Sequence, residues 1–83
     1  KLQVNPALAD LLRVLLKAKT ESSGVAAKLI ATAADLDAIA AGERDVQTLR
    51  GWRLEVFGTD ALALCAGKIA LTAVGNEVKV VPV

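Results

Sequence analysis

Histidine, tyrosine and methionine are absent from this chain of 83 residues, and cysteine, tryptophan and phenylalanine each occur once. The lack of histidine removes the commonest general base and a common metal ligand. A single cysteine, Cys65, excludes an internal disulfide and a cysteine-rich zinc site, and it is typical of a reducing compartment. We therefore expect a cytoplasmic protein, and catalysis by an activated nucleophile is disfavoured.

An excess of charge of one sign is also missing. Ten basic and nine acidic residues leave a net charge of +1, whereas nucleic-acid-binding domains usually carry a clear basic excess. No apolar run reaches the roughly 20 residues that cross a bilayer, and no signal peptide is visible. Because the chain opens on Lys1 and contains no methionine, we expect a fragment of a longer protein, with no membrane partner.

The acidic residues do not form a recognisable metal or catalytic motif. Asp35, Asp45 and Asp60 are each placed to cap a predicted helix. No histidine is present to activate Cys65, so we interpret it as a buried structural thiol. Phosphate-binding glycine loops are absent as well. The sequence therefore predicts a non-catalytic chain that holds no cofactor and no metal.

Helix signals fill the first half of the chain. Asn5 and Pro6 are typical of a helix start, and the leucines that follow recur at helical spacing until Gly24. A short helix is expected over about 26–31. The sequence TAAD (32–35) fits a capping box that opens a further helix, and Gly42 ends that helix.

The segment LRGWRLEVFG (49–58) surrounds the only tryptophan with two arginines. We predict a helix over 46–57, on which Leu49, Trp52, Val56 and, less centrally, Phe57 share an apolar stripe. Trp52 is accordingly expected to be buried. Gly58 is expected to end this helix, and Thr59 to cap a short helix over 60–66.

The tail KIALTAVGNEVKVV (68–81) is rich in β-branched residues and has Gly75 and Asn76 at its centre, which predicts a two-residue hairpin. In that register Leu71 faces Val80 and Ala73 faces Val78. Because an isolated hairpin is marginal in water, its apolar face is expected to pack on the helices.

Together these patterns predict a mainly α fold in one domain over 1–83, with helices over 6–66 and a β-hairpin over 68–82. The predicted core is apolar and contains Leu8, Leu11, Leu12, Leu15, Leu29, Ile30, Leu36, Ile39, Leu49, Trp52, Val56, Leu62, Ile69 and Leu71.

Five basic residues are the candidates for binding nucleic acid by phosphate contacts: Arg13, Lys17, Lys28, Arg50 and Arg53. If these side chains converge in space, they form a patch that binds without reading sequence. The alternative is that they are ordinary solvated or ion-paired surface residues.

Two longer stretches carry a family resemblance. GVAAKLIATAADLDAIAAGE (24–43) resembles the centre of the helicase-and-ribonuclease-D C-terminal (HRDC) domain, and LADLLRVLLKAKTESSGVA (8–26) resembles its long first helix. The segment from Leu49 to Val81 resembles the extreme C-terminus of ribonuclease D from some bacteria. The resemblance implies a small HRDC-like bundle of about five helices with a C-terminal β-hairpin.

The resemblance also implies a function. The chain would be the accessory domain of a 3′–5′ exoribonuclease that trims RNA such as tRNA precursors, and divalent metals would be held by acidic residues in a separate domain. The expected partners are RNA, bound weakly, and the nuclease domain of the parent, with the chain itself a monomer. The alternative function is a structural or interdomain module that binds no nucleic acid.

Overall fold

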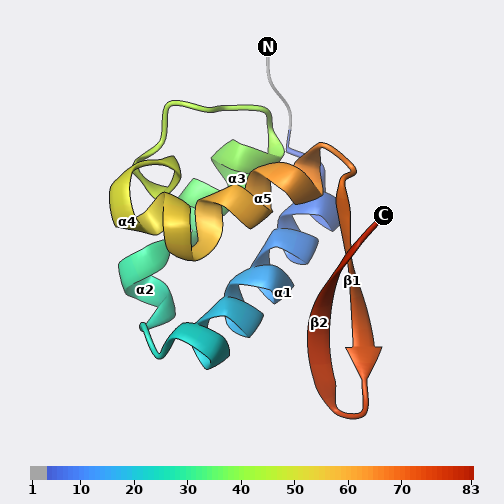
Figure 1. Ribbon diagram of the computed structural model, residues 1–83. Coiled ribbons are helices and arrows are strands. Elements are labelled where there is room, and N and C mark those ends of the chain that lie inside the picture. The colour runs from blue at the N-terminus through green and yellow to red at the C-terminus, as the bar shows by residue number, and fades with distance from the viewer. Residues whose placement is uncertain (1–3) are drawn as a thin grey trace.

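The computed structural model describes residues 4–83 (Figure 1). In chain order the elements are α1 (Pro6–Ser23), α2 (Ala27–Ile30), α3 (Ala33–Ala40), the 3₁₀ turn η1 (Gln47–Leu49), α4 (Gly51–Arg53), the π-helical turn η2 (Leu54–Gly58), α5 (Thr59–Cys65), β1 (Ile69–Val74) and β2 (Glu77–Pro82). Four helices pack together, namely α1, α2, α3 and one continuous helix made of α4, η2 and α5, and a two-stranded hairpin follows them. This arrangement confirms the mainly α bundle with a C-terminal hairpin.

Both ends of α1 and the start of α3 are set by local signals, as predicted. The Asn5 side chain accepts a hydrogen bond from the Leu8 backbone N–H at 3.1 Å, and Gly24 ends α1 in the left-handed conformation. The capping box of α3 is complete. Thr32 Oγ1 accepts from the Asp35 N–H at 3.2 Å, and the Asp35 carboxylate accepts from the Thr32 N–H at 2.9 Å.

The segment from 46 to 65 differs from the prediction. Instead of one helix over 46–57, a 3₁₀ turn is followed by extended backbone at Arg50 (φ −134°, ψ 149°) and by Gly51 at φ +60°. A continuous helix then runs from Gly51 to Cys65 through α4, η2 and α5. The left-handed conformation at Gly51 is inexpensive only for glycine, and it turns the chain into this helix.

Gly58 does not end a helix, which corrects the prediction. It lies inside the continuous helix at φ −60°, and a Cβ atom added there would be 2.9 Å from the Thr48 carbonyl oxygen. Thr59 does not cap either, because its hydroxyl donates to the Leu54 carbonyl at 2.9 Å. Glycine is therefore required at 58 by the close approach of η1 and not by a chain reversal.

Asp45 and Asp60 do not cap helices, contrary to expectation. Neither η1 nor α5 has a side-chain cap. Asp45 instead forms an ion pair with Arg50, and Asp60 forms an ion pair with Lys19. The second pair links α5 to α1, which lie next to each other in the bundle (Figure 1).

Phe57, and not Trp52, is the large aromatic residue of the core. The Phe57 side chain is 0% exposed, whereas Trp52 is 44% exposed. Because the helix continues through Gly58, its buried stripe is Phe57, Ala61 and Leu64, at spacings of four and three. Trp52 lies five positions before Phe57, with the π-helical turn between them, and it does not belong to this stripe. Because Trp52 is exposed, the prediction that it is buried is wrong.

The rest of the core follows the prediction in part. Leu11 and Leu29 are exposed, and Leu62 is half-buried outside the core cluster, so these three do not belong to it. Leu8, Leu49, Val56, Ile69 and Leu71 are half-buried and pack against it. The buried apolar residues are Ala9, Leu12, Leu15, Leu16, Ile30, Ala31, Leu36, Ile39, Phe57, Ala61 and Leu64.

The hairpin has the predicted register, with Leu71 opposite Val80 and Ala73 opposite Val78. Gly75 at φ +64°, followed by a residue without positive φ, is the pattern of a II′ turn. The hairpin packs on the helices only near its base, where Ile69, Leu71 and Val80 contact the core. Its distal half is exposed on both strands and extends past α1 (Figure 1).

We predict that Gly58→Ala destabilises the domain, by about 1–3 kcal/mol, because a Cβ at this position meets a backbone carbonyl that cannot move freely. Helix propensity alone predicts the opposite sign, since alanine in a helix is favoured over glycine by about 1 kcal/mol. Urea unfolding followed by circular dichroism distinguishes the two. An increase in the free energy of unfolding would contradict the close approach of Gly58 and Thr48.

Candidate nucleic-acid interface

The surface around Trp52 is organised by the end of α2. This helix has only four residues, and the carbonyl groups of Leu29 and Ile30 at its end need donors from elsewhere. Arg53 Nε donates to the Leu29 carbonyl at 2.8 Å, and Thr48 Oγ1 donates to the Ile30 carbonyl at 3.3 Å. The segment from 48 to 53 is thereby fixed against α2.

Trp52 lies directly beside this junction. The guanidinium carbon of Arg53 is 4.5 Å from the centroid of the Trp52 ring, within cation–π distance. Leu29 is 58% exposed, and Lys28, the residue before it, is exposed too. We call Lys28, Leu29, Trp52 and Arg53 the tryptophan edge. It combines an accessible aromatic ring with two cationic side chains, one of which is held in place by a hydrogen bond.

Arg50 is two residues from Trp52 and adds a third positive charge to this stretch of chain. It forms an ion pair with Asp45, and both side chains are largely exposed. Exposed ion pairs contribute little, typically about 0–1 kcal/mol. The guanidinium of Arg50 can therefore exchange Asp45 for a phosphate at small cost.

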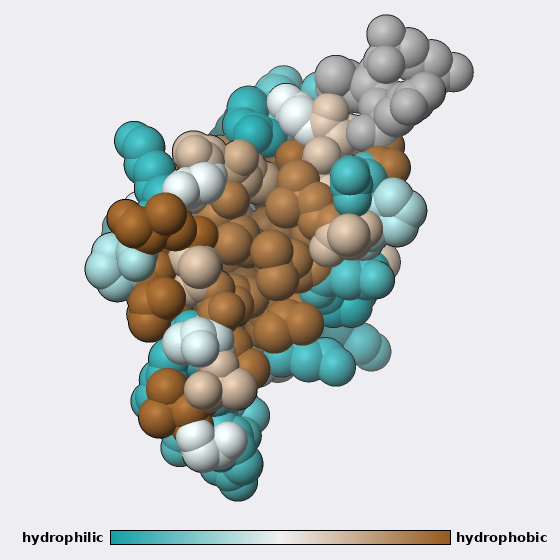
Figure 2. Space-filling model, turned by 90° about the vertical axis from the view of Figure 1, so that its right-hand side faces the viewer, coloured by the Kyte–Doolittle hydropathy of each residue, from teal (hydrophilic) through white to brown (hydrophobic). Residues whose placement is uncertain are grey.

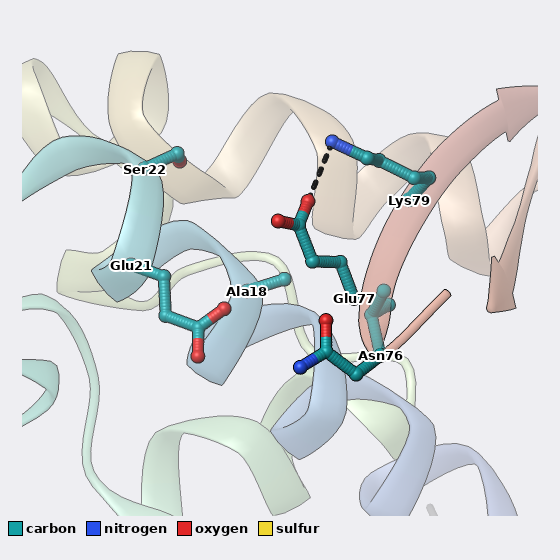
Figure 3. Close-up of a pocket in the computed structure, with 7 residues that line it drawn as sticks. Ala18, Glu21, Ser22, Asn76, Glu77 and Lys79 are labelled. Carbon is teal, nitrogen blue, oxygen red and sulfur yellow. Dashed lines mark ion pairs between the residues drawn. The ribbon is translucent and has the colours of Figure 1, made fainter. Parts of the chain in front are cut away.

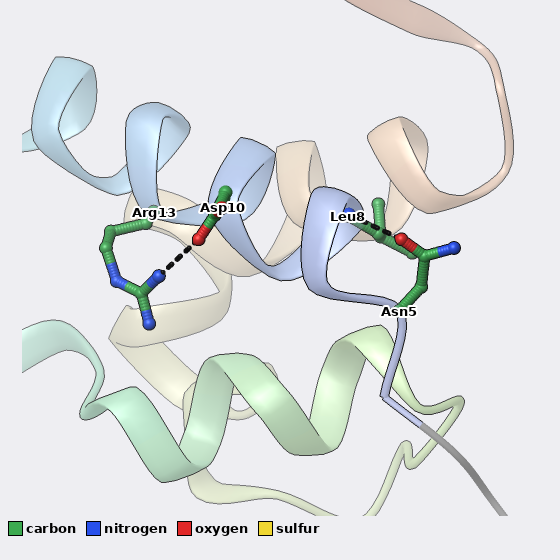
Figure 4. Close-up of polar contacts among 4 residues, drawn as sticks. All are labelled: Asn5, Leu8, Asp10 and Arg13. Atoms are coloured by element: carbon green, nitrogen blue, oxygen red, sulfur yellow. Dashed lines mark hydrogen bonds and ion pairs between the residues drawn. The ribbon is translucent and has the colours of Figure 1, made fainter.

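The two α1 candidates are placed differently. Arg13 forms an ion pair with Asp10 at 2.8 Å, one turn apart on α1 (Figure 4). Lys17 is exposed and forms no ion pair within residues 4–83. No hydrogen bond or ion pair of the described chain connects either residue with the tryptophan edge. Of the five predicted site residues, Arg53 binds the end of α2, the helix that carries Lys28, and Arg50 is close to Arg53 in sequence.

The sequence interpretation missed two members of the edge, Leu29 and the exposed ring of Trp52, because it assigned both to the core. The stripe of Phe57, Ala61 and Leu64 appears when helical periodicity is carried through Gly58. Regular periodicity does not extend back to Trp52, because the π-helical turn lies between Trp52 and Phe57. No local signal in the sequence indicates that Trp52 or Leu29 is exposed.

A cleft of about 440 Å³ lies elsewhere, between the end of α1 and the hairpin. Glu21 and Ser22 line it from α1, and Asn76 and Glu77 from the hairpin (Figure 3). Glu77 forms an ion pair with Lys79 at 2.9 Å, and the hydrogen bond from Lys79 lowers the pKa of the Glu77 carboxyl. Two carboxylates make this cleft unsuitable for a phosphate backbone.

The described residues show no arrangement for metal or thiol chemistry. Within residues 4–83 no three histidine, cysteine, aspartate or glutamate side chains lie close enough together to hold a metal ion. Burial raises the pKa of the Cys65 thiol, and nearby Arg44 offsets this only partly. A raised pKa disfavours the thiolate, the nucleophilic form, and the half-buried side chain packs against the core. None of the helices within residues 4–83 has the length and apolar character needed to cross a membrane.

Comparison with known proteins gives a consistent result. A ribonuclease D from Jannaschia sp. (strain CCS1) is 62% identical over 80 residues, which cover 96% of this chain and 21% of that protein. A ribonuclease D from Granulibacter bethesdensis is 51% identical over 78 residues, covering 93% of the chain and 20% of that protein. The homologues of this chain are ribonucleases D.

The chain spans about a fifth of the length of the ribonuclease D proteins that it matches. The predicted resemblance to ribonuclease D is confirmed, whereas the assignment to the HRDC domain stays a prediction. No protein-family model matches the chain, and no solved structure is a significant match.

We predict that the fluorescence of Trp52 is that of an exposed indole, because the ring is 44% exposed at the tryptophan edge. The emission maximum should lie to the red of that of a buried indole, and acrylamide should quench it, though less than it quenches N-acetyltryptophanamide, because Arg53 lies over the ring. Unfolding in urea should move the maximum little. A blue-shifted maximum that moves to the red on unfolding would show that the ring is buried.

Proposed function

We propose that this chain is the non-catalytic C-terminal accessory domain, of HRDC type, of a cytoplasmic ribonuclease D-like 3′–5′ exoribonuclease. In this proposal it contributes weak, sequence-nonspecific RNA binding through the tryptophan edge. The catalytic domain and its divalent metals would belong to the rest of that protein. The substrates would be RNA 3′ ends, including those of tRNA precursors.

The observation that carries the proposal is the accessible ring of Trp52 beside cationic side chains. Aromatic rings stack on the bases of single-stranded nucleic acid irrespective of sequence, at about 1–3 kcal/mol per base. Lys28, Arg50 and Arg53 supply charges that contact phosphates on either side of such a base. A net charge of +1 limits the long-range attraction, so binding is expected to be weak.

A second candidate function is an interdomain module without RNA binding. It is favoured by the exposed apolar residues on α1 and the hairpin, among them Leu11, Val14 and Val78. The two functions use different surfaces, so an RNA titration with variants at the tryptophan edge separates them.

The test is to titrate the 83-residue chain into fluorescently labelled single-stranded RNA and tRNA at two salt concentrations and to follow anisotropy. We expect salt-sensitive binding. Trp52→Ala should weaken it by about five- to 150-fold, and Trp52→Phe should weaken it less, because a smaller ring still stacks. Lys28→Gln should flatten the dependence of log K on log salt for single-stranded RNA by about 0.7.

Lys68→Gln is the matched control, because it removes one exposed lysine that directly precedes β1 and is not a member of the tryptophan edge. It should change affinity less than Lys28→Gln does. Absence of binding at low salt, or equal effects of Trp52→Ala and Lys68→Gln, would reject RNA binding by this surface and leave the interdomain module.

A further inference from the structure

The guanidinium group of Arg53 contacts two partners at once. Its Nε donates a hydrogen bond to the Leu29 carbonyl at 2.8 Å, and its Cζ lies 4.5 Å from the centroid of the Trp52 ring. Leu29 precedes Arg53 by 24 residues and belongs to α2, whose last residue, Ile30, is buried in the core. The guanidinium is therefore fixed relative to the helical bundle, as well as touching its neighbour in the sequence.

The Trp52 ring is restrained through this guanidinium. Trp52 is exposed, and an exposed side chain has rotational freedom that it loses when a ligand stacks on it. A cation that lies over the ring and is itself held by a carbonyl group restricts this motion before any ligand is present. Within residues 4–83 Arg53 is the only cation that lies over the ring.

The same contact makes the two faces of the ring different. A planar guanidinium stacks on the face of an aromatic ring, so Arg53 occupies one face of Trp52. Trp52 nevertheless keeps 44% of its surface exposed, which leaves ring surface available to a ligand. Every base has a flat π-face, and stacking on an indole therefore requires no particular base.

The tryptophan edge lies away from the apolar side of the molecule. In Figure 1, α2 and α4 are on the left and the hairpin is on the right. Figure 2 turns the hairpin side toward the viewer and shows a broad area of hydrophobic residues above the projecting tip. Because phosphate groups lose hydration against apolar surface, a nucleotide is better accommodated at the tryptophan edge.

We propose that Arg53 is a positioning residue, which holds the Trp52 ring in the orientation in which an unpaired RNA base stacks on the face that the guanidinium leaves open. This inference rests on the proposed RNA binding and states how the ring is prepared for it. A lysine at position 53 keeps the positive charge but lacks the planar, forked group that makes both contacts. Charge and positioning are therefore separable at this residue.

The first measurement needs no RNA. Trp52 is the only tryptophan, so the time-resolved fluorescence anisotropy of the chain reports rotation of this ring on the picosecond-to-nanosecond timescale. Arg53→Lys should increase the amplitude of the fast component by at least about twofold, because the ring is released. An equally small fast component in the unsubstituted chain and in Arg53→Lys would overturn the proposal.

Arg50→Lys is the matched control. Arg50 is two residues from Trp52, and its exposed ion pair with Asp45 is one that a lysine can also form. The substitution is chemically the same as Arg53→Lys, but it removes no contact with the Trp52 ring. It should leave the fast component of the anisotropy unchanged.

The second measurement is the affinity for a labelled single-stranded oligoribonucleotide at two low salt concentrations, at which weakened variants still bind. Arg53→Lys should weaken binding by about two- to tenfold, with an unchanged dependence of log K on log salt. Arg50→Lys should change neither quantity. In the Trp52→Ala background Arg53→Lys should have no further effect, because the ring that Arg53 positions is gone. Urea unfolding verifies that each variant is folded.

The outcomes distinguish the positioning role from RNA binding itself. If Trp52→Ala weakens binding and Arg53→Lys does not, RNA binding stands and the positioning role is overturned. An equal loss on Arg53→Lys with and without the Trp52 ring would overturn it too, because Arg53 would then act as an independent contact or through the fold. If the unsubstituted chain binds no RNA, or Trp52→Ala has no effect, the proposed function fails and the inference fails with it.

Discussion

Helix α2 has four residues and is too short to be stable by itself. The carbonyl groups of Leu29 and Ile30 at its end have no donor within the helix and need hydrogen bonds from elsewhere in the chain. Arg53 and Thr48 supply these donors from a segment about 20 residues further along the chain. Thr48 is fully buried in this role, and the close approach of Gly58 to its carbonyl holds the 3₁₀ turn against the π turn. Phe57 then fills the core, and Trp52 is left at the surface beside the arginine that completes α2.

The molecule thus presents two surfaces of different chemistry. The tryptophan edge is small, cationic and aromatic, and it is set by the end of α2. The other surface carries exposed apolar residues of α1 and the hairpin, among them Leu11, Val14 and Val78. Although the net charge is only +1, an exposed aromatic ring and a guanidinium lie together at the tryptophan edge.

Elements with local signals could be predicted from the sequence. Asn5, Gly24 and the Thr32–Asp35 capping box fix helix ends through contacts within a few residues, and the glycine-asparagine turn fixes the hairpin register. The segment from 46 to 65 could not be predicted in this way. Its course depends on contacts between residues distant in sequence, such as Thr48 with Ile30, and a glycine required for close approach looks the same in sequence as one that ends a helix.

The candidate site could likewise be predicted from the sequence only in part. Composition and spacing identified the basic residues, but they could not show that Arg53 binds the end of α2 while Arg13 pairs with Asp10 on its own helix. The burial of Trp52 was predicted from regular helical periodicity, and that periodicity does not hold across the π-helical turn between Trp52 and Ala61.

The most direct measurement is the ¹H–¹⁵N correlation spectrum of the 83-residue chain titrated with a single-stranded oligoribonucleotide. One tryptophan gives one indole N–H peak, and that of Trp52 is therefore assigned without ambiguity. RNA binding at the tryptophan edge predicts that this peak moves together with the backbone amides of Lys28 and Leu29, while those of the hairpin stay in place. An indole peak that does not move, with shifts confined to the hairpin or to none of the chain, would contradict it.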